Sequence, residues 1–267
     1  MTNILILLVI ISGSFLHAYD RVISLSPRLT SSIYLLGADE KLIANTIFCT
    51  TPEEANTKEK IGDLVNINLE KILRLKPDLV LVSPLAKKKK IQKLNQLGIK
   101  TEFFPQPKTY QQLTEQFLKL GALVGKLQKA TDINIMMKKE IQKLSRTTHR
   151  KQPKVFFQVG SNPLFTITKS SYLNDYIELA GGINVAKNAR NGQYSKEAVI
   201  KSNPDIIFIM LMGITGETEK KEWEKYPIID AVRHQRIYLM DPYKFGSPTP
   251  ITFVETLWEI KDLITKK

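Results

Sequence analysis

The chain is poor in cysteine and histidine: among 267 residues, Cys49 is the single cysteine, and there are three histidines. A disulfide within the chain is therefore excluded, so stability must come from the packing of apolar side chains. A dedicated transition-metal site is also not expected, because His149 and His234 lie far apart in sequence and His17 falls in an N-terminal apolar segment. His234 could still complete a mixed site with tyrosines or carboxylates. No permanently bound cofactor is indicated.

The sequence also lacks the motifs on which common enzyme sites depend. It has no G-x-S-x-G nucleophile elbow and no phosphate-binding P-loop, and Gly213 to Gly216 lacks the spacing of a dinucleotide-binding loop. The adjacent acids Glu53 and Glu54 follow Pro52 at an expected helix start, where the positive end of the helix dipole accounts for them. We therefore expect a binding protein and not an enzyme.

Long apolar runs are absent after the N-terminus. The first run, residues 4–15, is shorter than the ~20 residues that span a bilayer, and polar residues begin at Tyr19. This pattern predicts a signal peptide over residues 1–18, with Ala18 as the last residue removed, and a soluble periplasmic protein. No Lys or Arg precedes the run, so an uncleaved anchor or a buried strand stays open as an alternative. No Cys follows the run, so a lipid anchor is not expected.

Negative charge is scarce relative to positive charge: 39 Lys and Arg against 26 Asp and Glu give a formal net charge of +13. Such a balance suits nucleic acid, an anionic membrane face or a small anionic ligand. Lys87 to Lys90, and the lysines between Lys126 and Lys143, fall on the polar sides of expected helices, as on solvated helix faces. No basic strand with interleaved aromatic residues accompanies them, and export conflicts with a genomic partner, so nucleic-acid binding is not expected.

Short runs rich in Val, Ile and Leu alternate with helical patterns along the whole chain. Runs that are apolar on both faces, separated by helices, indicate parallel strands covered on two sides. The expected strands cover residues 21–26, 42–47, 79–83 and 101–104 in the first half, and 154–159, 206–211 and 237–240 in the second. Because the chain without its leader is long enough for two cores, each half is expected to form an α/β lobe.

Between the halves, residues 125–146 form one uninterrupted helical pattern. Leu127, Ile133 and Met137 are among the apolar residues that recur at helical intervals, and neither Gly nor Pro interrupts them. Such a helix of ~20 residues is a rod of ~30 Å, stiffer than a Gly/Ser linker. The expected organisation is a leader over 1–18, an N-terminal lobe over 19–124, a connecting helix over 125–150 and a C-terminal lobe over 151–267.

An internal repeat relates the two halves. Residues 68–82 read NLEKILRLKPDLVLV, and residues 195–209 read SKEAVIKSNPDIIFI. In each, an Asn or Ser able to cap a helix stands two residues before a Glu, and Pro-Asp follows that Glu by seven residues, before an apolar strand. Matching helix-turn-strand units predict two lobes of similar construction, related by a pseudo-twofold axis.

With these features the chain resembles the periplasmic binding proteins of the cobalamin and iron-chelate class. The segments that carry the resemblance, in the family's order, are RVISLSPRLTSSIYLLGA (21–38), IGDLVNINLEKILRLKPDLVLVS (61–83), KVFFQVGSNPLFT (154–166), ELAGGINVA (178–186) and GQYSKEAVIKSNPDIIFI (192–209). The resemblance implies an α/β fold with two Rossmann-like lobes joined by a single long backbone helix. It also implies a monomeric substrate-binding protein of an ABC transporter.

For function, the resemblance implies capture of an iron chelate (a siderophore or haem) or a cobalamin-like metal chelate between the lobes. The chelate would then be delivered to the permease in the inner membrane. A cobalamin-binding or nickel-complex-binding protein of the same fold stays open as an alternative. A periplasmic sensor or interaction module without a transport role is a further alternative, since it could share this fold.

In this family an acidic residue on the outer edge of each lobe docks onto basic residues of the permease. The repeated units place these two residues at Glu70 and Glu197. A Glu in the first turn of a helix can instead simply complement the helix dipole, which is worth ~0.3–1 kcal/mol. Because the spacing is repeated in both halves, the docking role is preferred.

Ligand contacts are expected from loops at the ends of the strands, as in other α/β sheets. A guanidinium and an ammonium suit a chelated anion, and aromatic rings supply apolar area. The predicted ligand-contacting residues are Arg28, Phe48, Ser83, Tyr194, Asp241, Tyr243, Lys244 and Phe245. A cap or an ion pair at the surface stays open as an alternative for Arg28, and a place in the core of the lobe stays open for Tyr243 and Phe245.

Positions that carry aromatic rings in the cobalamin-binding members hold other residues in this chain. They are Leu64, Ser83, Val159 and Asn191, and only Phe48 keeps an aromatic side chain. An anionic iron chelate is therefore preferred to cobalamin.

Overall fold

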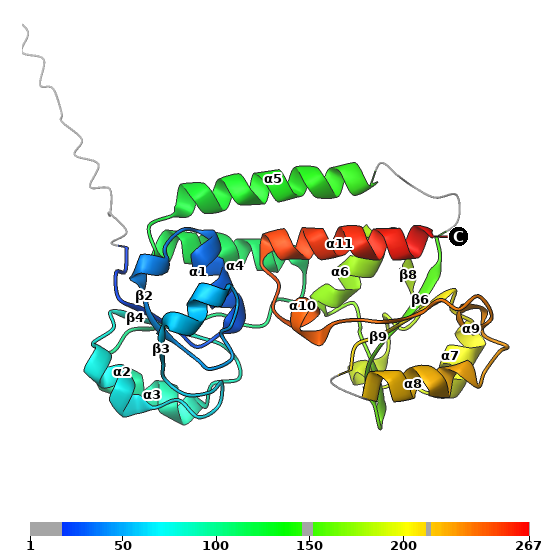
Figure 1. Ribbon diagram of the computed structural model, residues 1–267, viewed down its shortest axis with the longest axis horizontal. Helices are drawn as coiled ribbons and strands as arrows, with labels where there is room; N and C mark the ends of the chain where they lie inside the picture. The colour runs from blue at the N-terminus through cyan, green and yellow to red at the C-terminus, as the bar shows by residue number, and fades with distance from the viewer. Residues whose placement is uncertain (1–17, 146–151, 212–214, 267) are drawn as a thin grey trace, which may run out of the picture.

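Two β-sheets, one in each half of the chain, form the centres of two α/β lobes that lie side by side (Figure 1). The computed structural model describes residues 18–145, 152–211 and 215–266. Residues 1–17 of the predicted leader and residues 146–150 of the predicted connecting segment lie outside this part of the chain. The α/β fold with two lobes that the sequence predicts is confirmed.

The N-terminal lobe has a five-stranded sheet in the order β3-β2-β1-β4-β5, in which every pairing is parallel. Its strands are β1 (Val22–Ser24), β2 (Leu42–Asn45), β3 (Glu59–Lys60), β4 (Leu79–Val82) and β5 (Thr101–Phe103). Its helices are α1 (Pro27–Leu35), α2 (Leu69–Leu75), α3 (Lys88–Gln96) and α4 (Tyr110–Leu123), with 3-10 turns η1 (Asp39–Lys41) and η2 (Glu53–Thr57). All four residues of β4 are buried, as expected for a parallel strand covered on both faces.

The C-terminal lobe has a sheet in the order β10-β9-β6-β7, with β8 also paired to β6. Only the β6–β7 pairing in it is antiparallel. Its strands are β6 (Lys154–Ser161), β7 (Leu164–Thr166), β8 (Ile183–Asn184), β9 (Ile206–Ile209) and β10 (Ile237–Leu239). Its helices are α6 (Tyr172–Leu179), α7 (Lys196–Ser202), α8 (Thr215–Glu224), α9 (Asp230–Arg233), α10 (Pro242–Gly246) and α11 (Pro250–Thr265), with the 3-10 turn η3 (Arg190–Gly192).

The expected strands are all present, but the sequence did not indicate β3, β7 and β8. These strands have two, three and two residues, respectively. A strand of two or three residues has too few positions to show an alternating pattern by itself, and these three do not fall in the apolar runs noted in the sequence, so pairing with a neighbouring strand defines them.

The internal repeat is visible in the caps of α2 and α7. The side chain of Asn68 accepts a hydrogen bond from the Lys71 amide at 3.0 Å, and that of Ser195 accepts one from the Ala198 amide at 3.1 Å. Both helices end on a residue in the left-handed conformation, Lys76 with φ 45° and Asn203 with φ 43°. The two units therefore share their start and their end.

The aspartate of each Pro-Asp pair accepts backbone hydrogen bonds from the start of the central strand of its lobe. Asp78 accepts hydrogen bonds from the amides of Asp20 (2.8 Å) and Arg21 (3.0 Å), immediately before β1. Asp205 accepts one from the Lys154 amide (2.7 Å), at the first residue of β6. Each aspartate thus ties the start of one strand to the start of the central strand beside it, which explains why the repeat includes it.

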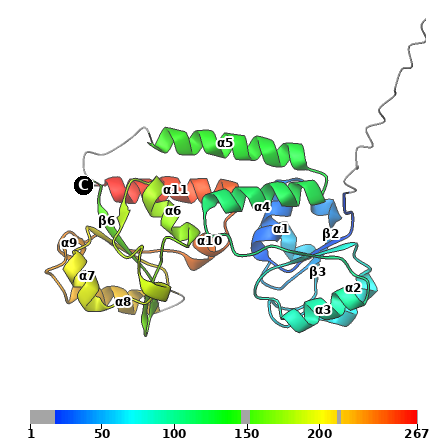
Figure 2. The same cartoon turned by 180° about the vertical axis from the view of Figure 1, so that it is seen from behind.

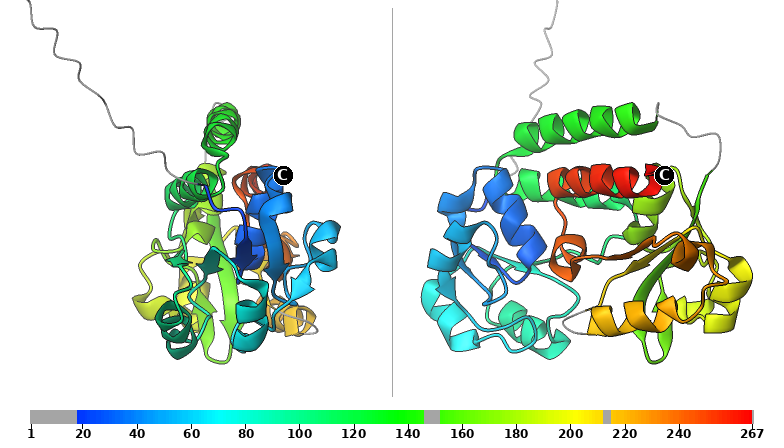
Figure 3. Two further views of the ribbon diagram at one scale, coloured as in Figure 1. Left: turned by 90° about the vertical axis from the view of Figure 1, so that its left-hand side faces the viewer. Right: turned by 45° about the vertical axis from the view of Figure 1, so that its right-hand side comes forward.

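The connecting helix is α5 (Leu127–Ser145), which lies over both lobes in Figure 1. It starts at Leu127 and not at Gly125, because Gly125 has φ 71° and ends the preceding helix α4. Figures 2 and 3 show α5 packed along α4 and α11, which run beneath it. The connection is therefore one layer of a three-helix arrangement and not an isolated rod.

One hydrophobic core extends through both lobes. Buried Val22 of the N-terminal sheet and buried Phe157 of the C-terminal sheet belong to the same cluster of packed side chains. In the middle of that cluster, the ring of Phe253 on α11 lies 4.5 Å from the ring of Tyr110 on α4 and 4.1 Å from the ring of Tyr176 on α6. Any large rotation of one lobe against the other would have to separate these rings.

We therefore expect the lobes to move little when a ligand binds. Small-angle scattering of the free and the ligand-saturated protein should give closely similar radii of gyration, because hinge closure would expose part of the shared core to water. A binding protein with a flexible hinge, measured in parallel, is the positive control. A closure as large as that of the control would contradict the expectation.

Candidate ligand-binding site

The carboxyl ends of the two sheets meet at the junction between the lobes. Arg28 stands in the first turn of α1, directly after β1, and lies close enough to Tyr172 at the start of α6 for the two side chains to interact electrostatically. The hydroxyl of Tyr172 donates a hydrogen bond to the Phe245 carbonyl at 2.5 Å. The amide of Tyr110 donates one to the carboxylate of Asp175 at 2.6 Å. These contacts join α1, α4, α6 and α10 at one place.

In each sheet, the strand order reverses on the two sides of a central strand, β1 in the N-terminal lobe and β6 in the C-terminal lobe. In the N-terminal lobe, β1 has β2 on one side and β4 on the other, and the loops after β1 and β4 are linked by the Ser83 hydroxyl, which donates to the Leu25 carbonyl at 3.2 Å. In the C-terminal lobe, β6 lies between β9 and β7. Ligands of open α/β sheets bind outside the carboxyl ends of strands at such points.

A cavity of about 770 Å³ opens at this edge of the C-terminal sheet, and we call it the C-lobe cavity. Val159 near the end of β6 and Met210 directly after β9 form part of its wall. Lys169, Lys187 and Asn191 line it from the loops around η3 and before α6. Val159 and Asn191, two of the positions that carry rings in cobalamin-binding members, therefore share one cavity here.

Arg28 is almost fully buried, with 8% of its surface exposed. Its guanidinium donates a hydrogen bond to the side-chain oxygen of Gln116 at 2.7 Å. Burial lowers the pKa of Arg28 to about 10, and the nearby Tyr172 hydroxyl acts in the opposite direction. The guanidinium is therefore still charged at neutral pH.

Apolar side chains are exposed on the loops that follow the strands of the N-terminal sheet. Ile47 and Phe48 follow β2 and are 51% and 52% exposed, Val65 follows β3 and is 40% exposed, and Leu85 follows β4 and is 59% exposed. We call these four residues the N-lobe apolar loops. Phe48 thus lies in a group of exposed apolar residues at the carboxyl edge of the sheet.

The other predicted contacts have partners within the protein. Tyr194 stacks on Phe156, with 5.8 Å between ring centroids, and its hydroxyl donates to the Val185 carbonyl at 3.5 Å. Lys244 forms an ion pair with Glu259 of α11. Asp241 is exposed, and the side chain of Tyr243 lies outside the described part of the chain.

Phe245 is the one predicted contact whose position disagrees with its expected role. Its side chain is only 2% exposed, and its ring meets those of Tyr176 (5.2 Å) and Phe157 (6.1 Å) edge-on. A ring enclosed in this way has no free face for a ligand. Of the two roles that the sequence left open for Phe245, the structure favours the core, because the ring on the short helix α10 packs into the shared core.

The two predicted docking acids are exposed and occupy equivalent positions. Glu70 stands in the first turn of α2, and Glu197 in the first turn of α7. Hydrogen bonds from its own backbone amide and from the Ser195 side chain lower the pKa of Glu197. In Figure 1, α2 and α7 lie on the side of the molecule opposite to α5, one on each lobe.

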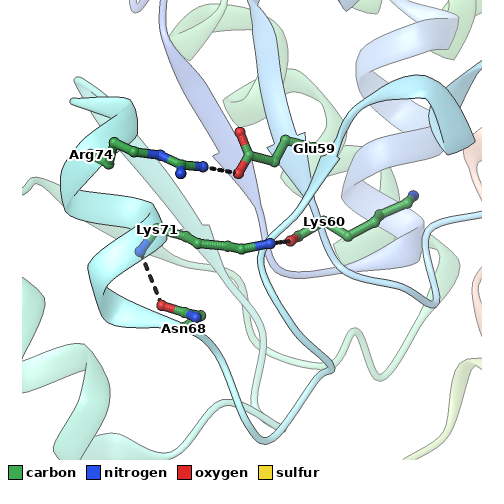
Figure 4. Close-up of polar contacts among 5 residues, drawn as sticks. All are labelled: Glu59, Lys60, Asn68, Lys71 and Arg74. Atoms are coloured by element: carbon green, nitrogen blue, oxygen red, sulfur yellow. Dashed lines mark hydrogen bonds and ion pairs between the residues drawn. The ribbon is translucent and has the colours of Figure 1, made fainter.

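Helix α2 is held against the sheet by two side chains, which fixes the position of the turn that carries Glu70. Figure 4 shows the ammonium of Lys71 donating to the Lys60 carbonyl at 3.1 Å and Arg74 paired with Glu59. Both partners belong to the edge strand β3. An acid on a helix anchored twice loses little side-chain and backbone freedom on docking, which favours a role in recognition.

The sequence did not single out Lys169, Lys187 and Met210 as wall residues. Lys169 follows β7, a three-residue strand, so nothing in the pattern marked the residue as part of a loop at a sheet edge. In the described residues, no group of three or more His, Cys, Asp and Glu side chains is placed to hold a metal ion. None of the helices described has the length and apolar character required to cross a membrane.

Comparison with known proteins agrees with this architecture. Residues 22–244 match the model of the periplasmic binding protein family. The chain is 31% identical to an uncharacterized ABC transporter substrate-binding lipoprotein of Bacillus subtilis, over 83% of this chain and 73% of that protein. It is 27% identical to the vitamin B12-binding protein of Vibrio cholerae, over 87% of this chain and 85% of that protein.

A solved structure shows the same arrangement of lobes. The crystal structure of a possible iron-binding (periplasmic solute-binding) protein from Staphylococcus epidermidis superposes with a TM-score of 0.83 at 27% identity, covering 94% of this chain and all of that one. The match with the family model extends from the first strand of the N-terminal lobe to α10 of the C-terminal lobe. The chain therefore belongs to the periplasmic binding protein family.

Proposed function

We propose that this protein is the substrate-binding component of an ABC importer, which captures a metal chelate between its lobes and delivers it to a permease. The observation that carries the proposal is the C-lobe cavity, which lies at the carboxyl ends of β6 and β9 in the C-terminal sheet. A cavity of about 770 Å³ is within the range of sites for small molecules. The relatives named for vitamin B12 and for iron support a chelate as the class of ligand.

Delivery is supported by Glu70 and Glu197. Two exposed carboxylates at equivalent positions on two lobes can meet two equivalent basic sites, as in a permease with two similar subunits. Positive charge on the receiving surface would also orient the receptor during encounter. Catalysis has no part in this role.

Export is part of the same proposal. Residues 1–18 would be removed as a signal peptide, leaving Tyr19 as the first residue of the mature chain. The Tyr19 amide donates to the Leu123 carbonyl at the end of α4, at 2.9 Å, so the chain is attached to the lobe from that residue onward. A short apolar run before an attached first residue suits a removable leader.

The ligand is expected to be an iron chelate more than cobalamin. Val159 and Asn191 replace rings on the wall of the C-lobe cavity, and Ser83, half-buried with its hydroxyl bonded to Leu25, replaces another ring in the N-terminal lobe. Each lost ring removes apolar contact area that a corrinoid would use. The 27% identity to a vitamin B12-binding protein keeps cobalamin as the second candidate.

Tryptophan and tyrosine quenching of the purified protein should rank the candidates directly. We expect ferric siderophores or haem to bind at least about tenfold more tightly than cobalamin, which corresponds to ~1.4 kcal/mol. The binding of a nickel complex is measured in the same way. Tighter binding of cobalamin than of every iron chelate would reverse the ranking.

Uptake separates transport from a sensing role. Vesicles that contain an ABC permease of the cobalamin and iron-chelate class should accumulate the bound chelate only when the protein is added. Binding without any stimulation of uptake would support the sensor or interaction module.

A further inference from the structure

Helix α3 begins with a run of lysines that its own stability does not require. Lys87 is the N-cap residue and makes no side-chain cap hydrogen bond, and Lys88, Lys89 and Lys90 follow it without any acidic residue in the first turn. Cations here face the positive end of the helix dipole, where acidic side chains are favoured. A run that opposes the local preference of its own helix points to a role in function.

The C-terminal lobe has an equivalent helix without this charge. Helix α3 follows β4 and helix α8 follows β9, and these two strands end the repeated helix-turn-strand units. Helix α8 carries Glu217 in its first turn and has four Glu against two Lys. Residues 83–100 contain six Lys and neither Asp nor Glu. The basic helix is therefore a property of one lobe and not a requirement of the fold.

Two hydrogen bonds place the lysine run beside the start of α2. The ammonium of Lys87 donates to the Asn66 side chain at 3.0 Å, and that of Lys90 donates to the Ile67 carbonyl at 2.6 Å. These two acceptors directly precede the cap of α2, whose first turn carries Glu70. Figures 1 and 2 show α2 and α3 side by side, on the side of the molecule opposite to α5. The lysines therefore lie on the same side as the predicted docking acid.

Three lysines of α3 are open to a partner. Lys88, Lys89 and Lys93 are exposed, and within the described ranges no hydrogen bond or ion pair engages their ammonium groups. Leu85, which is 59% exposed, stands just before the run. We call these four residues the α3 basic patch. Exposed cations beside an exposed Leu are typical of segments that lie on the surface of an anionic bilayer.

The docking role of Glu70 argues against the permease as the partner of these cations. In that role the permease site that receives Glu70 is basic, so further cations beside it would be repelled. The permease itself lies in a bilayer, whose anionic phospholipid headgroups attract basic segments within a Debye length of ~10 Å. An anionic surface that flanks a basic docking site therefore suits both Glu70 and the neighbouring lysines.

We propose that the α3 basic patch contacts anionic phospholipid headgroups beside the permease, while Glu70 contacts the permease itself. Lys88, Lys89 and Lys93 lie against the phosphates, and Leu85 enters the boundary between headgroups and acyl chains. The contact holds the N-terminal lobe close to the membrane and so raises the rate of encounter with the permease. The orientation of the protein on the membrane rests on the proposed function, whereas the affinity for lipid does not.

Binding to lipid vesicles that contain no permease tests the patch directly. Vesicles of phosphatidylcholine with about 30% phosphatidylglycerol should bind the protein at least about tenfold more tightly than vesicles of phosphatidylcholine alone. The preference should shrink as ionic strength rises from about 0.1 M to about 1 M, where the Debye length falls from about 10 Å to about 3 Å. Equal binding to the two kinds of vesicle would overturn the proposal.

A triple variant, Lys88→Gln with Lys89→Gln and Lys93→Gln, then locates the contact. It should weaken binding to the anionic vesicles by about tenfold to a hundredfold, because each lysine near an anionic surface contributes to the attraction. Its free energy of unfolding should stay unchanged or rise, since cations are removed from the positive end of a helix dipole. Vesicle binding as tight as that of the unaltered protein would overturn the patch.

The matched control replaces three exposed lysines of α5, Lys129, Lys138 and Lys139, by Gln. It removes the same charge from the opposite side of the molecule, so it should weaken vesicle binding by no more than about threefold. Leu85→Ala should weaken binding by about threefold to tenfold, because apolar area is withdrawn from the lipid. Its control is Ile228→Ala, at a residue 70% exposed between α8 and α9, which should have no effect. Equal losses in the two triple variants would overturn the proposal.

Uptake by a reconstituted permease separates this inference from the proposed function. With phosphatidylglycerol present, the α3 triple variant should need about tenfold more protein for half-maximal uptake, at unchanged ligand affinity. In phosphatidylcholine alone it should match the unaltered protein. An equal loss in both lipids would assign the lysines to the permease and overturn the lipid contact. Failure of the unaltered protein to bind any chelate or to stimulate uptake would overturn the proposed function, and vesicle binding would still decide this inference.

Discussion

Replacement of Glu70 or Glu197 by Lys is expected to reduce chelate import by a factor of about 30 or more without changing the affinity of the protein for its ligand. Each carboxylate is exposed in the first turn of a helix, and neither lines the C-lobe cavity. In a docked complex it would pair with a permease Arg or Lys, and loss of one partner of a desolvated pair costs ~2–5 kcal/mol. A Lys at the same position adds repulsion, so it should be more harmful than Ala.

The measurement is ligand affinity beside initial uptake rate for both single variants and the double variant. Glu115→Lys supplies the control, because it makes the same change of charge at an exposed position on α4. The double variant should be worse than either single variant but not additive, if one remaining contact cannot orient the receptor. Loss of affinity with normal uptake at saturating chelate would assign the two acids to the ligand site. No effect on either quantity would leave them as ordinary helix-start residues.

Phe253→Ala is expected to lower the free energy of unfolding by ~3–5 kcal/mol, the usual cost of removing a fully buried Phe ring. The side chain is 0% exposed and lies between Tyr110 and Tyr176, so the cavity left behind would open where the two lobes join. The melting temperature should fall by about 6 to 20 °C. The free energy of unfolding of a typical protein is only ~5–15 kcal/mol, so this single change would remove a large part of the stability of the folded state.

Chemical denaturation gives the free energy, and Trp258→Ala on the same helix is the control, since that side chain is 37% exposed. If the lobes were independent, Phe253→Ala would produce two separate transitions. A single transition at lower denaturant concentration is expected instead, because one cluster of side chains includes residues of both sheets. A change as small as that of Trp258→Ala would contradict the role given to the ring.

Much of the fold could be predicted because it depends on short-range patterns. The apolar runs that became β4 and β9 are buried on both faces, so neither sequence alternates between polar and apolar residues. Helix starts at Asn68 and Ser195 follow from side-chain capping, which acts over three residues. Strands β3 and β8, with two residues each, depend on partners far along the chain.

The candidate site was less accessible to prediction, because exposure is decided by packing. Arg28 could be placed in a loop after the first strand, but its burial and its bond to Gln116 depend on a helix 88 positions away. For Phe245 the sequence left a ligand contact and a core position open, and the same type of long-range contact buries the residue. The sequence did not single out Lys169 and Lys187, and only the folded chain brings them together on the wall of the C-lobe cavity.

By itself, the sequence determined the class of protein: two α/β halves, a matched pair of helix-turn-strand units and a helix between them. These features could be predicted because they depend on local periodicity and on helix capping. The tertiary structure alone decided that the lobes share a core around Phe253 and that Lys169 and Lys187 line one cavity. The physical reason is that periodicity and capping act over a few neighbouring residues. Burial, charge pairing and cavity shape arise from residues that are distant in sequence and meet only when the chain is folded.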